Sequence, residues 1–333
     1  MGAQAAALLD AGGPVGEVPP PASTLGTLRL TRPAVYALDV VARSHGGVGL
    51  APSAWDGTCL HRALPDGVPV VVGPDLTVSW SVPADAGWVH RVLSDVLCLD
   101  DDLGPLHDAC DRVPSLTWVR SAGAGRVLRS PSAFEDLAGT LASTRTSYAA
   151  TRRMTAALVR AGSACGAYPT PEEVLRLGED GVRAAGWGYR APSLLGLAQR
   201  ADQVERWRDP SVADDEVLAG LASLHGFGPY AAAVALPLLG HRPRPLVLDG
   251  WLRAQVPDPS VFAPMGRWAG TGLWLSVTGR RVGSITGRPG GSITGRPGGS
   301  ITGRPGGSIT GRPGGSGTRA PGSPTSSGTR LPP

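Results

Sequence analysis

The spacing of hydrophobic and polar positions changes once along the chain. In the N-terminal third, residues 76–82 and 27–30 alternate with the period of two that is typical of a half-buried strand, and residues 70–72 are a short β-branched run. Residues 34–41 have helical spacing instead. The pattern predicts a small α+β domain over residues 24–95.

The remainder of the folded sequence has helical periodicity. Capping boxes begin at Ser132 and at Thr170, each with a glutamate three residues later, and such pairs mark helix starts. Residues 214–223 are predicted to form the first helix of a helical hairpin. We therefore expect an all-helical domain over residues 96–278 and a protein that is mostly α.

Both ends of the chain have the composition of disordered segments. Residues 1–23 contain three consecutive prolines and lack the basic start of a signal peptide, so we expect a disordered leader. Near the other end, an eight-residue unit rich in Gly, Ser, Pro and Arg starts at Gly283 and occurs four times. It has no apolar face that could stack, so residues 279–333 are predicted to be a disordered tail. This tail is either a cationic arm that attracts DNA or an unselected repeat expansion.

Charge is distributed unevenly along the sequence. All 31 basic residues are arginine, and eight of them lie within residues 279–333, a stretch that follows Asp258, the last of the 27 acidic residues. The net charge of +4 thus comes from the tail and gives no argument that the folded part binds nucleic acid.

Cysteine and histidine positions indicate no metal site. No cysteine pair has C-x-x-C spacing, and the histidines show no metal-ligand spacing. We expect four reduced thiols: Cys59, Cys98, Cys110 and Cys165. No apolar run approaches the length of a membrane span, so no membrane association is predicted.

The richest local signal is the segment L-H-G-F-G-P-Y-A-A at residues 224–232. Gly226 can take a positive φ in a tight turn, and Pro229 suits the first position of a helix. The N–H groups at such a helix start lack intrahelical partners and can bind an anion such as a DNA phosphate. Asp249 follows, just before another amphipathic stretch. The alternative interpretation is an ordinary αα-turn with no ligand, followed by an aspartate that caps a helix.

The hairpin and Asp249 together resemble the helix-hairpin-helix (HhH-GPD) DNA glycosylase superfamily, whose hairpin reads L-x-G-[VI]-G-x-x-[TA]-A and whose catalytic Asp lies in a V-D-[TS] context. Residues 125–136 resemble its G-R-x-L-R-x-P-x-x-F-E-x segment, and residues 168–172 its F-P-T-P-E segment. Residues 186–191 resemble G-x-G-Y-R-A, which is commonest in the branch of alkylbase (3-methyladenine) and 8-oxoguanine glycosylases. The resemblance implies an all-helical glycosylase domain and excision of an alkylated or oxidised purine from DNA.

The resemblance also assigns residues. Asp249 is implied to be catalytic, with capping of a helix as its other interpretation, and Gly226, Gly228 and Tyr230 are implied to form the phosphate-binding hairpin. Lyase-type relatives carry a lysine at the position of Tyr230, where its amine forms a Schiff base with the sugar. This chain contains no lysine. It is therefore expected to be a monofunctional glycosylase that uses water and has no AP-lyase activity.

Other roles implied by the resemblance concern DNA opening and the base pocket. Arg145 stands where relatives have an Asn that fills the gap left by the flipped base; it either fills that gap, contacts phosphate or is a plain surface arginine. Candidate base-pocket residues are Trp187, Tyr189 and Trp251, each with core packing as the alternative.

Departures from the family pattern leave a second function open. Gly250 replaces the usual Thr or Ser after the catalytic Asp, and Pro237 lies inside the second hairpin helix. A non-catalytic DNA-binding paralogue is therefore the rival function.

The resemblance implies a partner and no resident cofactor. No cysteine follows Cys165, so an iron–sulfur cluster of the kind that some relatives bind is not expected, although a monovalent cation on the hairpin carbonyls would fit. The expected partner is double-stranded DNA with a damaged base, bound by a monomer in the cytoplasm of a bacterium, at the nucleoid.

Overall fold

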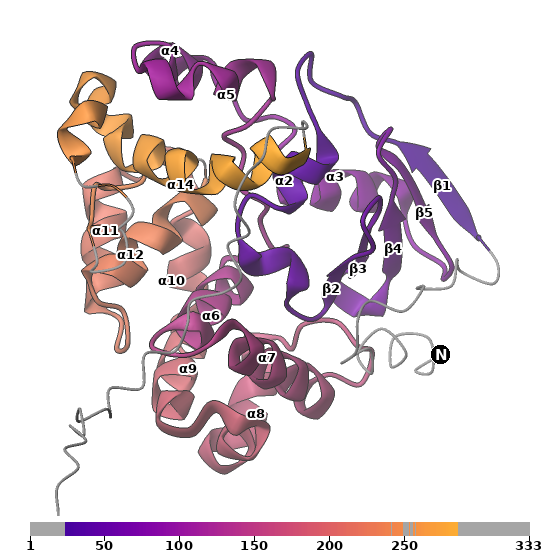
Figure 1. The fold of residues 1–333 in the computed structure, drawn as a ribbon. Helices are drawn as coiled ribbons and strands as arrows, with labels where there is room; N and C mark the ends of the chain where they lie inside the picture. The colour runs from indigo at the N-terminus through magenta and orange to yellow at the C-terminus, as the bar shows by residue number, and fades with distance from the viewer. Residues whose placement is uncertain (1–23, 241, 249–252, 254–255, 257, 286–333) are drawn as a thin grey trace, which may run out of the picture. The chain divides into compact units, whose positions relative to one another are not determined.

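The computed structural model describes residues 24–240, 242–248, 253, 256 and 258–285 (Figure 1). The predicted leader over residues 1–23 and most of the predicted tail lie outside these described residues.

An antiparallel five-stranded sheet with the order β1-β5-β4-β3-β2 forms the N-terminal part (Figure 1). Alternation fixes which face of it is buried: Val72 lies opposite Val78, Val70 lies opposite Trp80, and all four side chains are in the core. The strands predicted near residues 27–30, 70–72 and 76–82 are present. The bounds are β1 Gly26–Arg29, β2 Ser53–Trp55, β3 Leu60–Ala63, β4 Pro69–Val72 and β5 Thr77–Trp80.

Helices complete the core on this sheet. In α3 (Ala86–Val96), the Asp85 side chain caps the start by accepting a hydrogen bond from the Trp88 amide, and Leu93 packs in the same core as the strands. The other short elements here are α2 Leu38–Ala42 and the 3₁₀ segments Gly46–Gly49 and Pro65–Gly67. The α+β organisation predicted for this part is observed.

A helical bundle holds the second core. Ser132 caps α6 and Thr170 caps α8, as predicted, and Thr170 forms the full capping box with Glu173. The stretch from Ala191 to Arg206 forms two helices. The α-helices are α6 Ala133–Ser143, α7 Tyr148–Gly162, α8 Pro171–Val182, α9 Ala191–Ala198, α10 Ala201–Arg206, α11 Asp214–Ser223 and α12 Pro229–Ala235. Shorter helical turns are Arg183–Trp187, Gly188–Arg190 and Leu236–Leu238.

A third core joins two segments that are far apart in the sequence. The first contains α4 (Gly104–Cys110), the 3₁₀ turn Pro114–Leu116 and α5 (Trp118–Ser121). The second contains η7 (Pro259–Trp268) and α14 (Ala269–Ile285), which lies beside α4 and α5 in Figure 1. Their apolar side chains are buried together, among them Leu106, Leu116, Phe262, Met265 and Leu273.

The last described helix passes the predicted end of the helical domain. The sequence pattern placed that end at residue 278, whereas α14 continues to Ile285. Leu273, Leu275 and Val277 are buried along it, and the residues up to Ile285 contain no proline that would stop a helix. The repeat unit that starts at Gly283 therefore overlaps the end of α14.

A buried arginine connects the sheet to the bundle. The guanidinium of Arg62 on β3 donates to both carboxylate oxygens of Glu135 on α6 at 2.6 Å and to Ser53 Oγ at 2.6 Å. Burial raises the pKa of Glu135, and the charge of Arg62 opposes that rise. Because the Glu135 carboxylate faces Arg62, the capping box predicted at Ser132 is only half formed: Ser132 Oγ accepts from the Glu135 amide at 3.2 Å.

Candidate functional site

The predicted helical hairpin is present between α11 and α12. Its turn closes with a hydrogen bond from the Phe227 amide to the Leu224 carbonyl at 3.1 Å. Gly226 has φ +92°, a conformation that L-residues with a side chain rarely adopt, which explains why the turn has glycine there. Gly228 is the N-cap of α12 in extended conformation, and its carbonyl accepts from the Ala232 amide at 3.0 Å.

Only some amides of the turn are available to a ligand. The Phe227 amide is used inside the turn, and Pro229 has no N–H. Within the part of the chain that the structure describes, the Gly226 and Gly228 amides have no hydrogen-bond acceptor. Both residues are exposed, so their N–H groups can donate to an anion from solvent.

Packing holds the turn against α6 and α9. A Cβ on Gly226 would lie 2.7 Å from Leu141 Cδ1 on α6 and 3.2 Å from Ser193 Oγ on α9, whereas a Cβ on Gly228 would meet nothing within 4 Å. Ser193 Oγ lies 2.6 Å from Nδ1 of His225, the residue before the turn glycine. The first glycine is therefore required by packing, and the second faces open space.

The loop between α6 and α7 is attached to the same region. The buried Arg190, just before α9, donates from Nη2 to the Thr144 carbonyl, and the next residue is Arg145. Arg145 is exposed and has φ +48°, an unusual conformation for a residue with a long side chain. Two segments distant in sequence, residues 141–145 and 189–193, thus lie against the hairpin turn at residues 225–230.

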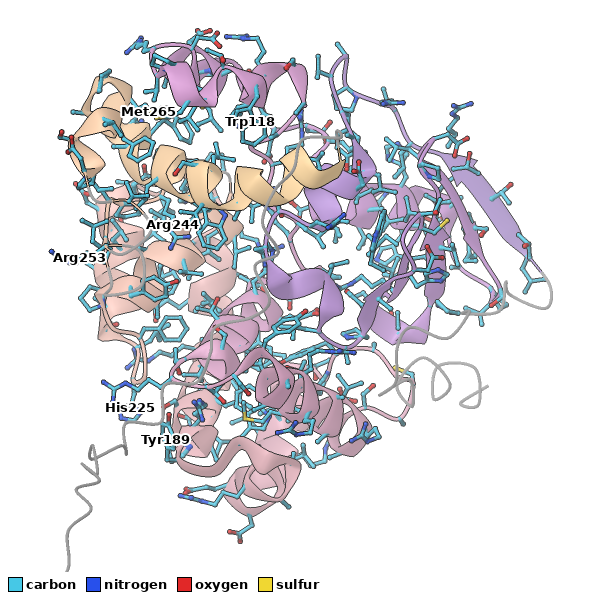
Figure 2. All side chains as sticks on the ribbon, viewed as in Figure 1. Trp118, Tyr189, His225, Arg244, Arg253 and Met265 are labelled. Atoms are coloured by element: carbon cyan, nitrogen blue, oxygen red, sulfur yellow. The ribbon has the colours of Figure 1, made fainter. Side chains whose placement is uncertain are left out.

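Tyr189 and His225 mark this end of the bundle in Figure 2. Tyr189 is 64% exposed, and the Arg190 guanidinium lies 4.4 Å from its ring centroid. An exposed aromatic ring beside the hairpin fits the predicted base-contact role. Trp187 does not fit that role, because it is fully buried and its indole Nε1 donates to the Met154 carbonyl at 3.3 Å. Its position assigns Trp187 to the core of the bundle.

A buried arginine lies behind the hairpin. The guanidinium of Arg244 lies 5.7 Å from the Tyr230 ring centroid on α12 and 4.5 Å from the Trp274 ring centroid on α14. Tyr230 is 38% exposed, so its side chain is accessible to solvent as well as close to this cation. The predicted hairpin residue Tyr230 therefore both packs and remains accessible.

Asp249 and Trp251, the predicted catalytic residue and one predicted pocket residue, lie outside the described residues. Sequence reasoning did not identify Arg190, Ser193 and Arg244 as parts of this region. An arginine or serine inside a helical segment carries no local signal of its partners, since those partners come from other segments.

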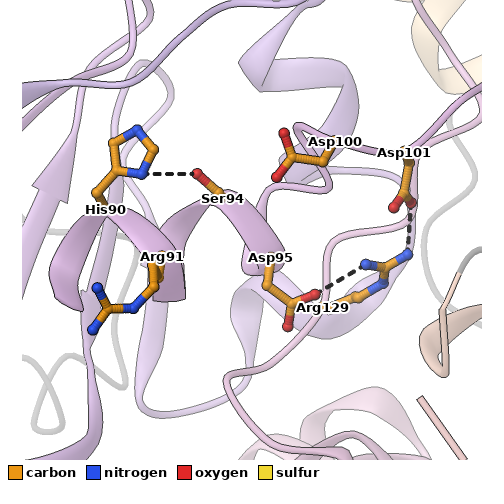
Figure 3. A pocket seen from close by; sticks show the side chains of 7 residues that line it. All are labelled: His90, Arg91, Ser94, Asp95, Asp100, Asp101 and Arg129. Atoms are coloured by element: carbon orange, nitrogen blue, oxygen red, sulfur yellow. Dashed lines mark hydrogen bonds and ion pairs between the residues drawn. The ribbon is translucent and has the colours of Figure 1, made fainter. Parts of the chain in front are cut away.

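An open cavity of about 340 Å³ lies elsewhere, at α3 (Figure 3). Its polar groups hold one another: Arg129 pairs with Asp95 at 3.1 Å and Asp101 at 2.6 Å, and His90 Nδ1 lies 3.5 Å from Ser94 Oγ. No group of three or more His, Cys, Asp or Glu side chains in the described residues could hold a metal ion. Within the same residues, no helix has the length and apolar character needed to cross a membrane.

Comparison with known proteins finds similarity in structure. No family model matches the sequence, and no curated protein matches it. The 3-methyladenine DNA-glycosylase from Archaeoglobus fulgidus superposes with a TM-score of 0.57 at 20% identity, covering 75% of this chain and 97% of that one. An 8-oxoguanine glycosylase/lyase from Clostridium acetobutylicum gives 0.54 at 19% identity, covering 67% and 86%. MBOgg1 with a low-affinity DNA ligand gives 0.58 at 17% identity, covering 77% and 96%. The chain has the fold of these DNA glycosylases, which confirms the predicted fold.

Proposed function

We propose that this protein is a monofunctional DNA glycosylase of base-excision repair, which flips an alkylated or oxidised purine out of duplex DNA and hydrolyses its N-glycosidic bond. The supporting observation is the convergence at the hairpin: two exposed turn amides, an exposed arginine on the α6–α7 loop and an exposed tyrosine before α9, within a glycosylase fold. These groups can hold a phosphate, fill a gap in the duplex and stack on a base, and flipping a base needs all three.

The chemistry assigned to Asp249 follows from the transition state. As the base departs, positive charge develops on the sugar, and a carboxylate stabilises that charge. The same carboxylate can orient the attacking water and take its proton, so the products are the free base and an abasic site. The sequence has no other acidic residue between Glu216 and Asp258, which leaves Asp249 as the carboxylate for this role.

The absence of lysine argues for hydrolysis without strand cleavage. A Schiff base requires an amine, and Tyr230 carries a phenol at the position where lyase-type relatives have lysine. We expect borohydride treatment during turnover to yield no covalent protein–DNA adduct on denaturing gels. A glycosylase/lyase run in parallel provides the positive control. A strong adduct with this protein would contradict the monofunctional assignment.

Arg145 is proposed to enter the duplex beside the flipped nucleotide. It is exposed next to the carbonyl that Arg190 holds, so the loop that carries it is anchored from behind. Tyr189 is proposed to contact the flipped base with its exposed ring, whose position is supported by the Arg190 guanidinium 4.4 Å from the ring centroid. Trp251 remains a proposed pocket residue.

Substitutions at the two turn glycines should have different effects: one should lower stability and the other should lower DNA affinity. Gly226→Ala places a side chain at φ +92° and 2.7 Å from Leu141 Cδ1, so we expect a loss of about 1–3 kcal/mol in the free energy of unfolding. Gly228→Ala has room and an ordinary φ of −84°, so folding should be intact. Its methyl group would stand beside the Gly228 amide, where a phosphate would approach, so DNA affinity should fall. Urea unfolding and fluorescence anisotropy with a labelled duplex measure the two effects. Equal stability of the two variants would contradict the structural assignment of Gly226.

Base release from duplexes that each carry one lesion tests the whole proposal. The panel should include alkylated adenine, alkylated guanine and 8-oxoguanine, with undamaged duplex as control. Release of any damaged base supports the function, and the pattern identifies the substrate class. DNA binding without release of any base would instead support the rival, a non-catalytic DNA-binding protein. The departures at Gly250 and at Pro237, where α12 gives way to a 3₁₀ turn after Ala235, favour that rival.

We propose that the protein acts on duplex DNA as a monomer and needs no resident cofactor. A monovalent cation on the hairpin carbonyls is a further part of the proposal. Replacing K⁺ by tetramethylammonium at constant ionic strength should lower DNA affinity if such an ion contributes.

A further inference from the structure

His225 is held in a defined orientation at the hairpin turn. Its Nδ1 lies 2.6 Å from the hydroxyl of Ser193, which is 5% exposed on α9. The histidine itself is exposed and projects at the end of the bundle in Figure 2. One ring nitrogen is thus fixed by a buried partner while the remainder of the ring reaches solvent.

The environment of Ser193 favours one tautomer of His225. Within the described residues, His225 Nδ1 is the single hydrogen-bond partner of Ser193 Oγ. If Nδ1 carried the hydrogen and donated it to Oγ, the buried hydroxyl hydrogen would have no acceptor among these residues. The tautomer with its hydrogen on Nε2, on the side away from Ser193, lets the Ser193 hydroxyl donate to Nδ1, and we assign this form to the neutral ring.

The Nε2–H of His225 adds a hydrogen-bond donor next to a turn in which backbone donors are missing or already used. Pro229 has no N–H, and the Phe227 amide is used by the Leu224 carbonyl. A Cβ on the adjacent Gly226 would meet Leu141 and Ser193 at 2.7 Å and 3.2 Å, so the turn that carries His225 lies close against α6 and α9.

We propose that His225 donates a hydrogen bond from Nε2 to a phosphate oxygen of the DNA strand held at the hairpin, and that Ser193 positions the ring for this contact. The inference rests on the proposed function, because it assumes that duplex DNA is the ligand. It adds a contact made by a side chain to those made by turn amides. A phosphate contact carries no information on sequence or damage, so it strengthens binding to every duplex alike.

The test compares variants for duplex affinity by fluorescence anisotropy at one fixed salt concentration. His225→Ala should weaken binding about tenfold, the size expected for one hydrogen bond to a charged group. The loss should be equal for damaged and undamaged duplexes. His225→Gln keeps a hydrogen-bond donor, so it should lose less affinity than His225→Ala. The affinity of Ser193→Ala should lie between those of His225→Gln and wild type. His90→Ala is the matched control, because His90 lies 3.5 Å from Ser94 Oγ in a similar pair on α3, in the cavity of Figure 3.

Three further measurements separate a contact from a structural role. Thermal melting should show that His225→Ala is fully folded at the assay temperature, although the buried Ser193 hydroxyl loses its partner and the melting temperature falls slightly. A long-range proton–nitrogen NMR spectrum of the free protein should show the Nε2–H form of His225. In single-turnover base release, the substitution should raise the enzyme concentration that gives the half-maximal rate and leave the saturated rate unchanged.

The proposed contact is overturned if His225→Ala binds duplex as tightly as wild type. It is also overturned if unfolding of the variant at the assay temperature accounts for its lost affinity, or if only the saturated rate of base release falls. Wild type that binds no duplex at all would overturn the proposed function, and this contact with it. Wild type that binds while His225→Ala is unaffected would overturn the contact alone.

Discussion

Asp249→Asn should reduce base release by about 10²–10⁴-fold while leaving duplex affinity within a factor of about two to three. The substitution removes the negative charge that stabilises the sugar cation and the group that takes the proton of the water. Asparagine and aspartate cap helices about equally well, so a purely capping Asp249 would tolerate the change. Single-turnover release from a lesion-containing duplex measures the effect.

Asp258→Asn provides a matched control for that experiment. Asp258 lies nine residues later, caps η7 by accepting from the Ser260 amide at 3.0 Å, and is exposed. Its replacement should leave base release unchanged. If Asp249→Asn releases the base as fast as wild type, Asp249 is not the catalytic carboxylate. If neither variant nor wild type releases any base from any duplex, the protein is not a glycosylase of the proposed class.

The second large effect concerns stability. Glu135→Ala should lower the free energy of unfolding by about 3–5 kcal/mol, because it leaves the buried Arg62 guanidinium without its carboxylate. Arg62 is 4% exposed and retains only the 2.6 Å hydrogen bond to Ser53 Oγ among the contacts described above. The pair joins β3 to α6, so the loss should appear in the unfolding of the sheet and of the bundle together. Urea unfolding followed by circular dichroism measures it.

Two comparisons show whether the cost comes from an uncompensated charge. The double variant Arg62→Met with Glu135→Leu removes both charges and should recover most of the stability, since apolar side chains often replace a buried ion pair at little cost. Glu179→Ala breaks the exposed pair between Glu179 on α8 and Arg183, the first residue of the turn that follows α8. Both side chains are about half exposed, so the change should cost less than about 1 kcal/mol. A double variant as unstable as Glu135→Ala would show that the charged pair itself, rather than its disruption, is needed.

Local sequence signals predicted the elements whose determinants are contained within one segment. Alternation located β4 and β5, capping residues located the starts of α6 and α8, and glycine spacing with Pro229 located the hairpin. β3 was not predicted because His61 and Arg62 occupy buried positions in it, so its alternation of apolar and polar residues is hidden.

Side-chain roles were predicted less well, because they depend on which segments meet. Trp187 has the residue type of a base-stacking platform, but the turn after α8 directs it into the bundle core. Glu135 has the spacing of a capping box, but a buried arginine from another element takes its carboxylate. The third core could not be inferred from periodicity, since its two halves, near residues 103–124 and 262–277, are separated by the entire bundle.

The sequence by itself determined which segments form helices or strands and where the hairpin lies. It also determined that no lysine is present to form a Schiff base. These properties depend on backbone conformation, periodicity and residue type, which neighbouring residues set. Only the tertiary structure decided that Ser193 orients His225, that Arg190 anchors the loop of Arg145 and that Tyr230 stacks on Arg244. Each of these contacts joins residues more than ten positions apart in the sequence, and only the packing of the folded chain brings them together.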